Sequence, residues 1–479
     1  MSGFWTDVEV RAALEGALVE VEAGPVLAYS GVATDTRTLE PGSLFVALRG
    51  ERYDAHAFLN EAAARGASGA VVERVPEGAP AELTYYVVPD TLAALGALAR
   101  RYRRSLDARV AAVVGSNGKT TTKELARAVV ASRYRVHATH GNLNNLVGVP
   151  LTLLASPPDA EALVIEIGTN SPGEVERLGR IVEPDVAIVT AIAEEHLEGL
   201  GDLAGVLREE TSILGLLGED GLALVSEEPP ELAERARSLA ARVRVAGWGG
   251  RADAELRAEG VALDEEGRAR FTWRGREVRL GFRGRPNVRN ALLALGLGLE
   301  WGVDPDAAAA ALAAVEPAGM RGELHRYGEL VVIADCYNAN PASVDAALDL
   351  LSSLPRGRRR VVVLGSMLEL GESSDALHRR TASLAAASDI DLIVATGEFA
   401  RAFAPHAAEL GDRLVAAEDP LAAYPALARR LTGRETVLLK GSRGVALERL
   451  LPCFEEDWGR PAGLDAGPGG DATRVVEGE

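Results

Sequence analysis

The segment between Val110 and Val130 constrains the fold more than any other part of the sequence. An apolar run at 110–114 is followed by the loop Gly115-Ser116-Asn117-Gly118-Lys119-Thr120-Thr121, and a helical pattern begins at Glu124. Glycine lets a backbone wrap closely around a phosphate, and a helix N-terminus offers free N–H groups and a positive dipole end. The segment therefore predicts a buried strand, a phosphate-binding loop and a helix.

Two side chains of this loop have predicted roles in binding a nucleotide such as ATP. Lys119 would reach the β- and γ-phosphates, and the Thr120 hydroxyl would bind Mg²⁺. The full Walker pattern has a glycine five residues before Gly118, where this chain has Val113. The loop is therefore a shortened phosphate loop, and an ordinary strand–turn–helix unit remains the alternative.

Composition excludes several classes of protein. A formal charge of −19 over 479 residues argues against a nucleic-acid backbone as partner and against a polybasic membrane anchor. Cys336 and Cys453 form neither a disulfide framework nor a metal site, which suits a reducing compartment. We find no targeting segment and no run of about 18 apolar residues, so we expect a cytoplasmic protein that binds neither nucleic acid nor membrane.

Lysine is almost absent from the chain. Of the 51 basic residues, only Lys119, Lys123 and Lys440 are lysine. Lysine carries a compact, strongly hydrated ammonium that arginine does not reproduce. We therefore expect these three positions to be functional, with chance retention as the alternative.

The strand and helix patterns predict three α/β domains and a tail. The first domain spans residues 1–105, and in the second domain, 106–315, strands alternate with helices, which predicts a largely parallel sheet. The third domain spans 316–455, and the glycine-rich residues 456–479 are expected to be disordered. Ligands of such sheets bind at the carboxyl ends of the strands.

Two polar side chains stand at predicted strand ends of the second predicted domain. Glu166 interrupts an apolar run, and because burying an unpaired carboxylate is costly, it should meet a cation. Together with Thr120 it would suit Mg²⁺, whereas an ion pair with an arginine is the alternative. His196 is a less usual magnesium ligand, and considered alone it is explained as a loop histidine.

Several polar residues stand in predicted turns, where each in isolation is explained as a turn residue. Amide side chains can bind a purine edge or a sugar hydroxyl, and a threonine–arginine pair can hold a diphosphate or a uracil. These turn residues are Thr36, Arg37, Asn142, Asn144, Asn145, Asn287 and Asn290.

Taken together, these motifs resemble the Mur ligase family from about residue 30 to residue 452. The discriminating motifs are the phosphate loop, the asparagine cluster at 142–145, Met367-Leu368-Glu369-Leu370-Gly371 and Lys440-Gly441-Ser442-Arg443-Gly444. Tyr337-Asn338-Ala339-Asn340-Pro341 is similar to the motif of the members that add D-alanyl-D-alanine rather than a single amino acid.

The resemblance implies an ATP- and Mg²⁺-dependent ligase of peptidoglycan synthesis with three α/β domains, the central one of the P-loop type and the last Rossmann-like. The implied reaction joins D-alanyl-D-alanine to UDP-N-acetylmuramoyl-tripeptide through an acyl phosphate. It implies Lys119, Glu166 and His196 as catalytic residues, with Mg²⁺ on Thr120, Glu166 and His196. Implied nucleotide contacts beyond the loop are Asn287, Asn290, Arg321 and Asp335. Implied substrate contacts are Thr36, Arg37, Asn142, Asn144, Asn145, Asn338, Asn340, Lys440 and Ser442.

Two positions depart from the family pattern. Glu210 stands where most members carry a lysine that is carbamylated, and Pro286 stands where a histidine packs near adenine. Our hypothesis is that Glu210 replaces the carbamate as a catalytic carboxylate, so that Glu210→Gln loses activity and Glu209→Gln does not. The alternative is a solvated helix glutamate in a degraded site.

Other functions therefore stay open: a related ligase of the Mur or folyl-polyglutamate type, or a non-catalytic nucleotide-binding homologue. The sequence does not determine the third residue of the tripeptide. Oligomeric state is not encoded in any motif, and a monomer is our working expectation.

Overall fold

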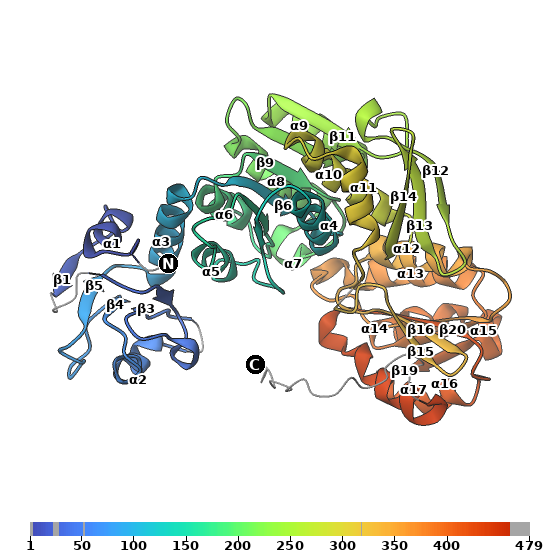
Figure 1. Cartoon of the computed structure of the whole chain (residues 1–479). Helices are drawn as coiled ribbons and strands as arrows, with labels where there is room; N and C mark the ends of the chain where they lie inside the picture. Colours follow the sequence, from blue (N-terminus) through green and yellow to red (C-terminus); the bar gives the residue numbers. More distant parts are fainter. Residues whose placement is uncertain (1–2, 23–27, 51–52, 318, 460–479) are drawn as a thin grey trace. The chain divides into compact units, whose positions relative to one another are not determined.

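The computed structural model describes residues 3–22, 28–50, 53–317 and 319–459 (Figure 1). The described residues form two compact units that divide between Glu316 and Pro317, except that 369–372 group with the first unit. The predicted boundary at 315 between the second and third domains stays a prediction. The boundary at 105 stays a prediction. No described helix is long and apolar enough to cross a membrane.

The first unit begins with a small sheet of order β1-β5-β4-β3-β2, in which β1 is antiparallel to β5 and the other pairs are parallel. Its apolar core includes Phe45, Leu59 and Tyr85. The elements are α1 (Asp7–Ala13), β1 (Glu20–Glu22), β2 (Val32–Ala33), β3 (Leu44–Val46), α2 (Leu59–Ala64), β4 (Gly69–Val72), β5 (Thr84–Val87) and α3 (Thr91–Ser105).

The large sheet of the first unit has the order β11-β10-β9-β6-β8-β7 and is parallel throughout, as predicted. Its strands are β6 (Arg109–Val114), β7 (Val136–Ala138), β8 (Ala162–Glu166), β9 (Val186–Val189), β10 (Leu222–Ser226) and β11 (Arg242–Ala246). Since β6 lies between β8 and β9, the phosphate loop that follows it emerges beside the carboxyl ends of both neighbours.

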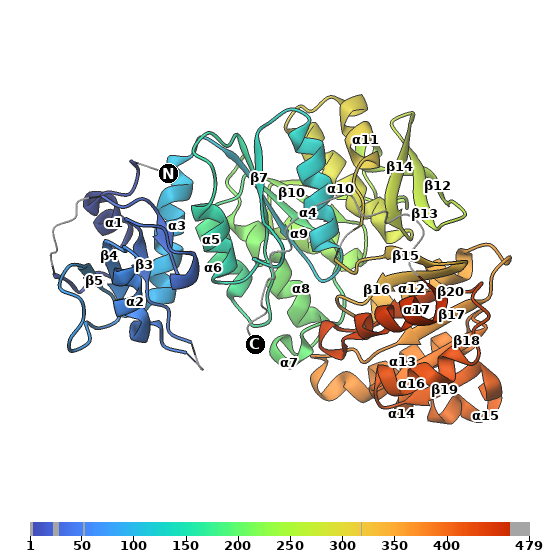
Figure 2. The same cartoon turned by 60° about the horizontal axis from the view of Figure 1, so that its bottom comes forward.

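Helices cover the faces of this sheet, and α4 packs against α10 over one of them (Figure 2). The helices are α4 (Lys119–Ala131), α5 (Gly148–Leu154), α6 (Glu174–Val182), α7 (Leu197–Leu200), α8 (Leu203–Thr211), α9 (Pro230–Leu239), α10 (Pro286–Glu300) and α11 (Pro305–Ala313). The apolar residues of β6, β8 and β9 are fully or almost fully buried, because helices lie on both sides of a parallel sheet.

A third sheet of this unit, which is antiparallel, was not predicted. It has the order β12-β13-β14, from β12 (Ala258–Leu263), β13 (Arg268–Trp273) and β14 (Arg276–Arg283). Phe271, Trp273 and Phe282 join the same core as α4 and α10. Burial alternates along β13, with arginines outward and apolar side chains inward, which is the period of a half-buried strand.

The second unit contains a sheet of order β15-β16-β20-β17-β18-β19, in which only β15 is antiparallel to its neighbour. Its elements are β15 (Glu323–Tyr327), β16 (Leu330–Asp335), α12 (Pro341–Ser353), β17 (Arg360–Leu364), α13 (Ser374–Ala387), β18 (Leu392–Thr396), α14 (Glu398–Ala402), α15 (Ala407–Leu410), β19 (Leu414–Ala417), α16 (Pro420–Ala428), β20 (Thr436–Lys440) and α17 (Leu450–Trp458). Helix α17 extends three residues into the segment expected to be disordered, and residues 460–479 lie outside the described part.

Candidate active site

The phosphate loop connects β6 to α4 and is tighter than the sequence pattern indicated. Helix α4 begins at Lys119, five residues before the expected start. Gly115 and Gly118 adopt φ values of +121° and +84°, a region that disfavours other residues. Asn117 lies between them, and Thr120 and Thr121 lie in the first turn of α4. The loop therefore presents the free N–H groups of a helix N-terminus to any anion placed there.

Ser116 ties the loop to the segment that follows β9. Its backbone N–H donates to Ala191 O at 2.7 Å. Its hydroxyl accepts from Ala193 N at 2.9 Å and donates to Ala193 O at 3.2 Å. The hydroxyl and the backbone N–H of Ser116 are thus both occupied within the protein.

The predicted nucleotide residues of α10 lie beside this loop. A Cβ at Gly118 would stand 2.5 Å from Asn290 Oδ1, so only glycine fits there. Asn290 donates to Asn287 Oδ1 at 3.0 Å, and Asn287 donates to Arg283 O at 2.6 Å. Pro286 is the first residue of α10, a position that suits proline because no helix hydrogen bond is lost.

Glu166, the last residue of β8, is 2% exposed and reaches Thr120 from below the loop. Its Oε1 accepts from Thr120 Oγ1 at 3.2 Å and from Asn144 Nδ2 at 2.9 Å. Its Oε2 is buried without a hydrogen-bond partner, and no arginine pairs with Glu166 among the described residues. A buried carboxylate oxygen next to a hydroxyl suits a hard cation such as Mg²⁺.

His196 is not joined to Thr120 or Glu166 by any contact in the described chain. It caps α7 with φ +49°, and its Nδ1 bonds to the carboxylate of Glu369, within the stretch 369–372 that groups with the first unit. Nowhere among the described residues do three or more His, Cys, Asp or Glu side chains form a ready metal cluster. The predicted magnesium role of His196 therefore stays a prediction.

Lys119 lies among acidic groups that the sequence did not bring together. Its Nζ donates to the carbonyls of Gly115 and Ser116 and lies 3.6 Å from Glu195 Oε1. Glu195 was not predicted as a site residue, although it precedes His196 directly. The sequence offered one signal for Glu195, its place in the loop after β9. The importance of Glu195 depends on its burial, which the sequence does not show.

Glu210 is 1% exposed, so the alternative of a solvated helix glutamate is wrong. Its Oε2 accepts from the Gly115 N–H at 2.7 Å, which places the carboxylate behind the phosphate loop. Burial raises the pKa of Glu210 to about 7, opposed by the charge of Lys119 and reinforced by that of Glu195. The hypothesis that Glu210 has a catalytic role stays a prediction.

Glu209 is also buried, and the expectation that Glu209→Gln leaves activity unchanged stays a prediction. Glu209 accepts from the N–H groups of Gly173 and Val175, at 2.8 and 2.9 Å, and from the Thr169 hydroxyl at 3.3 Å. These contacts cap the start of α6. A substitution of Glu209 therefore tests stability rather than chemistry.

Lys123 is explained by structure rather than by phosphate binding. Its side chain is 2% exposed, donates to Thr139 O at 2.8 Å and pairs with Glu124. The Thr139 hydroxyl in turn accepts from the Glu166 N–H at 2.9 Å. Lys123 thus supports the strand end that carries Glu166.

The remaining predicted substrate residues of the first unit have separate surroundings. Thr36 is buried, and the Arg37 side chain, 74% exposed, pairs with Asp35 at 2.7 Å. Asn145 accepts from the N–H groups of Val147 and Gly148 just before α5, whereas Asn142 is exposed. Of these predicted substrate residues, Asn144 is the one whose side chain contacts the phosphate-loop site, by donating to Glu166.

In the second unit the predicted residues gather at the carboxyl ends of β16 and β20. Lys440 is 3% exposed, donates to Asn338 O at 2.8 Å and lies 3.2 Å from Asp335 Oδ2. The Ser442 hydroxyl accepts from Leu368 N at 3.0 Å. Two further members complete this set: Asn340 caps α12 in a reciprocal pair with Ser343, and the Arg321 guanidinium stacks 3.9 Å from the Tyr337 ring centroid.

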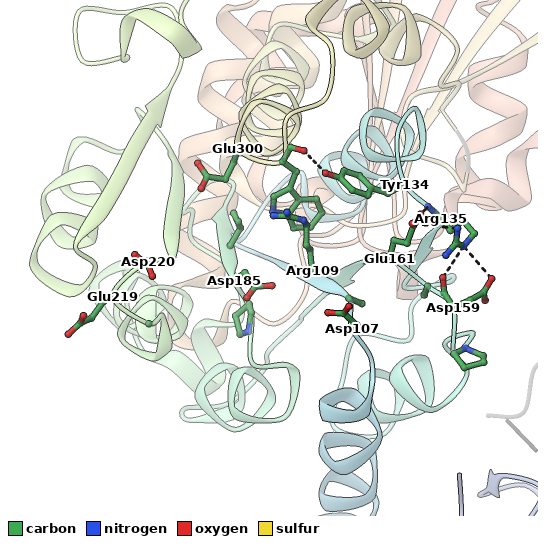
Figure 3. Close-up of a pocket in the computed structure, with 18 residues that line it drawn as sticks. Asp107, Arg109, Tyr134, Arg135, Asp159, Glu161, Asp185, Glu219, Asp220 and Glu300 are labelled. Carbon is green, nitrogen blue, oxygen red and sulfur yellow. Dashed lines mark hydrogen bonds and ion pairs between the residues drawn. The ribbon is translucent and has the colours of Figure 1, made fainter. Parts of the chain in front are cut away.

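A cavity of about 950 Å³ lies at the other edge of the central sheet, where β6, β9 and β10 begin (Figure 3). Acidic side chains dominate its lining: Asp107, Asp159, Glu161, Asp185, Glu219, Asp220 and Glu300. The acids would repel a nucleotide, and this edge is opposite the phosphate loop. Pocket size alone therefore does not locate the candidate site.

Comparison with known proteins gives matches along most of the chain. Residues 28–103 match the catalytic domain of the Mur ligase family, 113–298 the Mur ligase middle domain and 320–443 the Mur ligase glutamate ligase domain. The first match covers the small sheet, the second the phosphate loop and α10, and the third the sheet of the second unit.

Proteins named UDP-N-acetylmuramoyl-tripeptide–D-alanyl-D-alanine ligase are similar over nearly their whole length. The one from Bacillus subtilis is 36% identical, covering 88% of this chain and 92% of that protein. The one from Escherichia coli is 34% identical, covering 94% and 97%.

Solved structures agree with this result. MurF from Acinetobacter baumannii superposes with a TM-score of 0.85 at 33% identity, covering 94% of this chain and 99% of that one. MurF from Thermotoga maritima in complex with ADP superposes with a TM-score of 0.78 at 26% identity, covering 89% and 97%. The chain belongs to the Mur ligase family.

Proposed function

We propose that this chain is an ATP-dependent ligase that joins D-alanyl-D-alanine to UDP-N-acetylmuramoyl-tripeptide in peptidoglycan precursor synthesis. The observation that carries the proposal is the similarity, over nearly the full length, to ligases of that name. The phosphate loop, with Lys119 in its first helical turn, supports the use of ATP.

We assign the nucleotide to the phosphate loop and the start of α10. Backbone N–H groups of residues 118–121 would bind the phosphates, and Lys119 would neutralise part of their charge. Asn287 and Asn290 stand beside Gly118 and would contact the nucleoside. Arg321 and Asp335 belong to the second unit, and their nucleotide contacts stay a prediction.

The residues around Thr120 fit Mg²⁺. Glu166 offers a buried, unpartnered oxygen, and the Thr120 hydroxyl lies 3.2 Å from the other oxygen of the same carboxylate. We assign Thr120 and Glu166 as its ligands, and His196 as a further candidate. When bound, the ion would supply charge neutralisation at the phosphates.

The chemistry follows from charge. The tripeptide carboxylate attacks the γ-phosphorus of ATP, the bond to ADP breaks, and an acyl phosphate forms. The free amine of the dipeptide then attacks the acyl carbon, phosphate leaves, and the amine loses a proton. The first step brings an anion to an anion, so Lys119 has to neutralise charge as the phosphoryl group moves.

The polar set of the second unit is the proposed face for the dipeptide. Lys440, Ser442, Asn338 and Asn340 lie at adjacent strand ends, where ligands of such sheets bind. Lys440 is held by Asp335 in a fixed position. A buried, held ammonium suits recognition of a carboxylate such as the C-terminus of a dipeptide.

The test is phosphate release from ATP and Mg²⁺ with UDP-N-acetylmuramoyl-tripeptide, measured with and without D-alanyl-D-alanine. Release that depends on the dipeptide supports the proposal. Release that depends instead on a single amino acid would identify a different ligase of the family. Binding of ATP without release under any of these conditions would favour a non-catalytic homologue.

A further inference from the structure

Glu195 is a buried carboxylate without hydrogen bonds. It is 4% exposed, and neither Oε1 nor Oε2 has a hydrogen-bond partner. Lys119 Nζ lies 3.6 Å from Oε1, within the range of an ion pair but beyond a good hydrogen bond. Because a buried ion is costly unless it is paired and hydrogen-bonded, this carboxylate is poorly satisfied in the chain as it stands.

The position of Glu195 is fixed by the phosphate loop itself. Three hydrogen bonds join Ser116 to Ala191 and Ala193, two to four residues before Glu195. Gly115, on the same loop, donates to the neighbouring carboxylate Glu210. Glu195 cannot move far from the loop unless these bonds break, so its carboxylate stays near any ligand bound there.

Lys119 has two sets of acceptors in this structure: the loop carbonyls of Gly115 and Ser116, and the carboxylate of Glu195. Its proposed role is to contact the β- and γ-phosphates of ATP. In that role the ammonium shares its charge with phosphate oxygens. Glu195 would then lose part of its only described ion pair while remaining buried.

The charges around the loop require a further cation when ATP binds. Glu195 and Glu210 are buried carboxylates beside Lys119, Glu166 is a third buried carboxylate beside Thr120, and ATP adds several negative charges. Lys123 does not supply the missing positive charge, because it is paired with Glu124. A divalent metal ion that enters with the nucleotide would supply it.

We propose that Glu195 holds Lys119 while no nucleotide is bound and becomes a partner of the divalent cation that enters with ATP. The inference rests on the proposed nucleotide site but not on the identity of the amine substrate. Glu195 thus makes binding depend on the metal: without a divalent cation it repels ATP and retains Lys119, and with the cation it stabilises the complex.

The test is the affinity for ATP measured by titration calorimetry, once in EDTA and once in excess Mg²⁺. The variant is Glu195→Gln, which keeps the size and removes the charge. The control is Glu219→Gln, which removes an exposed charge at the opposite edge of the sheet. Thermal unfolding without ligands accompanies both variants.

We expect Glu195→Gln to bind metal-free ATP at least about tenfold more tightly than the parent chain, since a unit charge a few ångströms away is removed. We also expect the gain in affinity from Mg²⁺ to be at least about tenfold smaller, while Glu219→Gln behaves as the parent does. Without ligands, Glu195→Gln should unfold at the same temperature or higher.

Equal affinities and an equal Mg²⁺ gain in Glu195→Gln and the parent would overturn the role of Glu195 alone. So would a lower unfolding temperature of Glu195→Gln, because it would mean that the carboxylate serves the fold. Failure of the parent chain to bind ATP with or without Mg²⁺ would instead overturn the nucleotide site of the proposed function as well.

Discussion

Replacing Glu210 by glutamine removes an ionisable group that the fold holds against its preference. Glu210 is 1% exposed, and burial raises its pKa from the ordinary 4.5 to about 7. The folded chain therefore binds more protons than the unfolded chain between pH 4.5 and 7, so stability falls as the pH rises through this window. Above pH 7 the ionised carboxylate costs the fold about 3 kcal/mol.

Glutamine can keep the hydrogen bond from the Gly115 N–H, because its amide oxygen replaces Oε2. Glu210→Gln should therefore be as stable as the parent near pH 4.5 and about 3 kcal/mol more stable at pH 8. At about 2 °C per kcal/mol for a large domain, the midpoint of thermal unfolding should rise by about 6 °C. The same variant should lose ligase activity if Glu210 has its proposed catalytic role.

The assay is scanning calorimetry from pH 5 to 8 in EDTA without nucleotide, with the transitions of the two units fitted separately. Glu209→Gln is the matched control on the same helix turn. It should be less stable than the parent at every pH, because three donors lose an ionised acceptor. A Glu210→Gln variant that is less stable than the parent at pH 8, or equally offset at pH 5 and 8, would refute the reasoning.

Three further predictions test individual contacts. Lys119→Met should weaken ATP binding by about tenfold or more, and it should also lower the unfolding temperature, because Glu195 loses its described ion pair while it stays buried. Lys123→Met should lower the unfolding temperature by several degrees and weaken ATP binding much less. Calorimetry of both variants checks this, and a larger loss of ATP affinity in Lys123→Met than in Lys119→Met would contradict it. Glu166→Gln should reduce the Mg²⁺ dependence of ATP binding, measured as the ratio of affinities with and without the metal; an unchanged ratio would remove Glu166 from the metal site. Asn340→Ala should destabilise the second unit by about 1 kcal/mol through loss of the α12 cap, and an unchanged denaturation midpoint of that unit would argue against the cap.

Much of the fold could be predicted because its strands are long and buried on both faces. The apolar runs that became β6, β8, β9 and β10 have few polar residues, and glycine or polar residues mark where they end. Glu166 could be found for the same reason, because a carboxylate inside such a run has few explanations. Lys119 followed from the glycine loop before it.

The antiparallel sheet β12-β13-β14 was missed although its pattern was present. Arginines alternate with buried side chains along β13, and its pairing with β12 and β14 together with the packing of its buried face shows it to be a strand. Half-buried strands with long charged side chains carry a weaker signal than fully buried ones.

The acidic surroundings of Lys119 could not be predicted, because they come from separate segments. Glu195 follows β9 and Glu210 lies on α8, and nothing local distinguishes them from solvated glutamates. Their burial depends on how the loop after β9 and helix α8 pack behind the phosphate loop. Lys123 was expected to be functional because lysine is rare in the chain, and the structure shows instead a buried side chain that donates to Thr139 O.

The central claim is that this chain forms an amide bond between a UDP-linked tripeptide and a dipeptide at the expense of ATP. The most direct measurement incubates purified chain with ATP, Mg²⁺, UDP-N-acetylmuramoyl-tripeptide and D-alanyl-D-alanine, and follows the product by mass. We predict a UDP-linked pentapeptide, formed with one phosphate released for each bond. Absence of the pentapeptide in a chain that binds ATP and both substrates would contradict the claim.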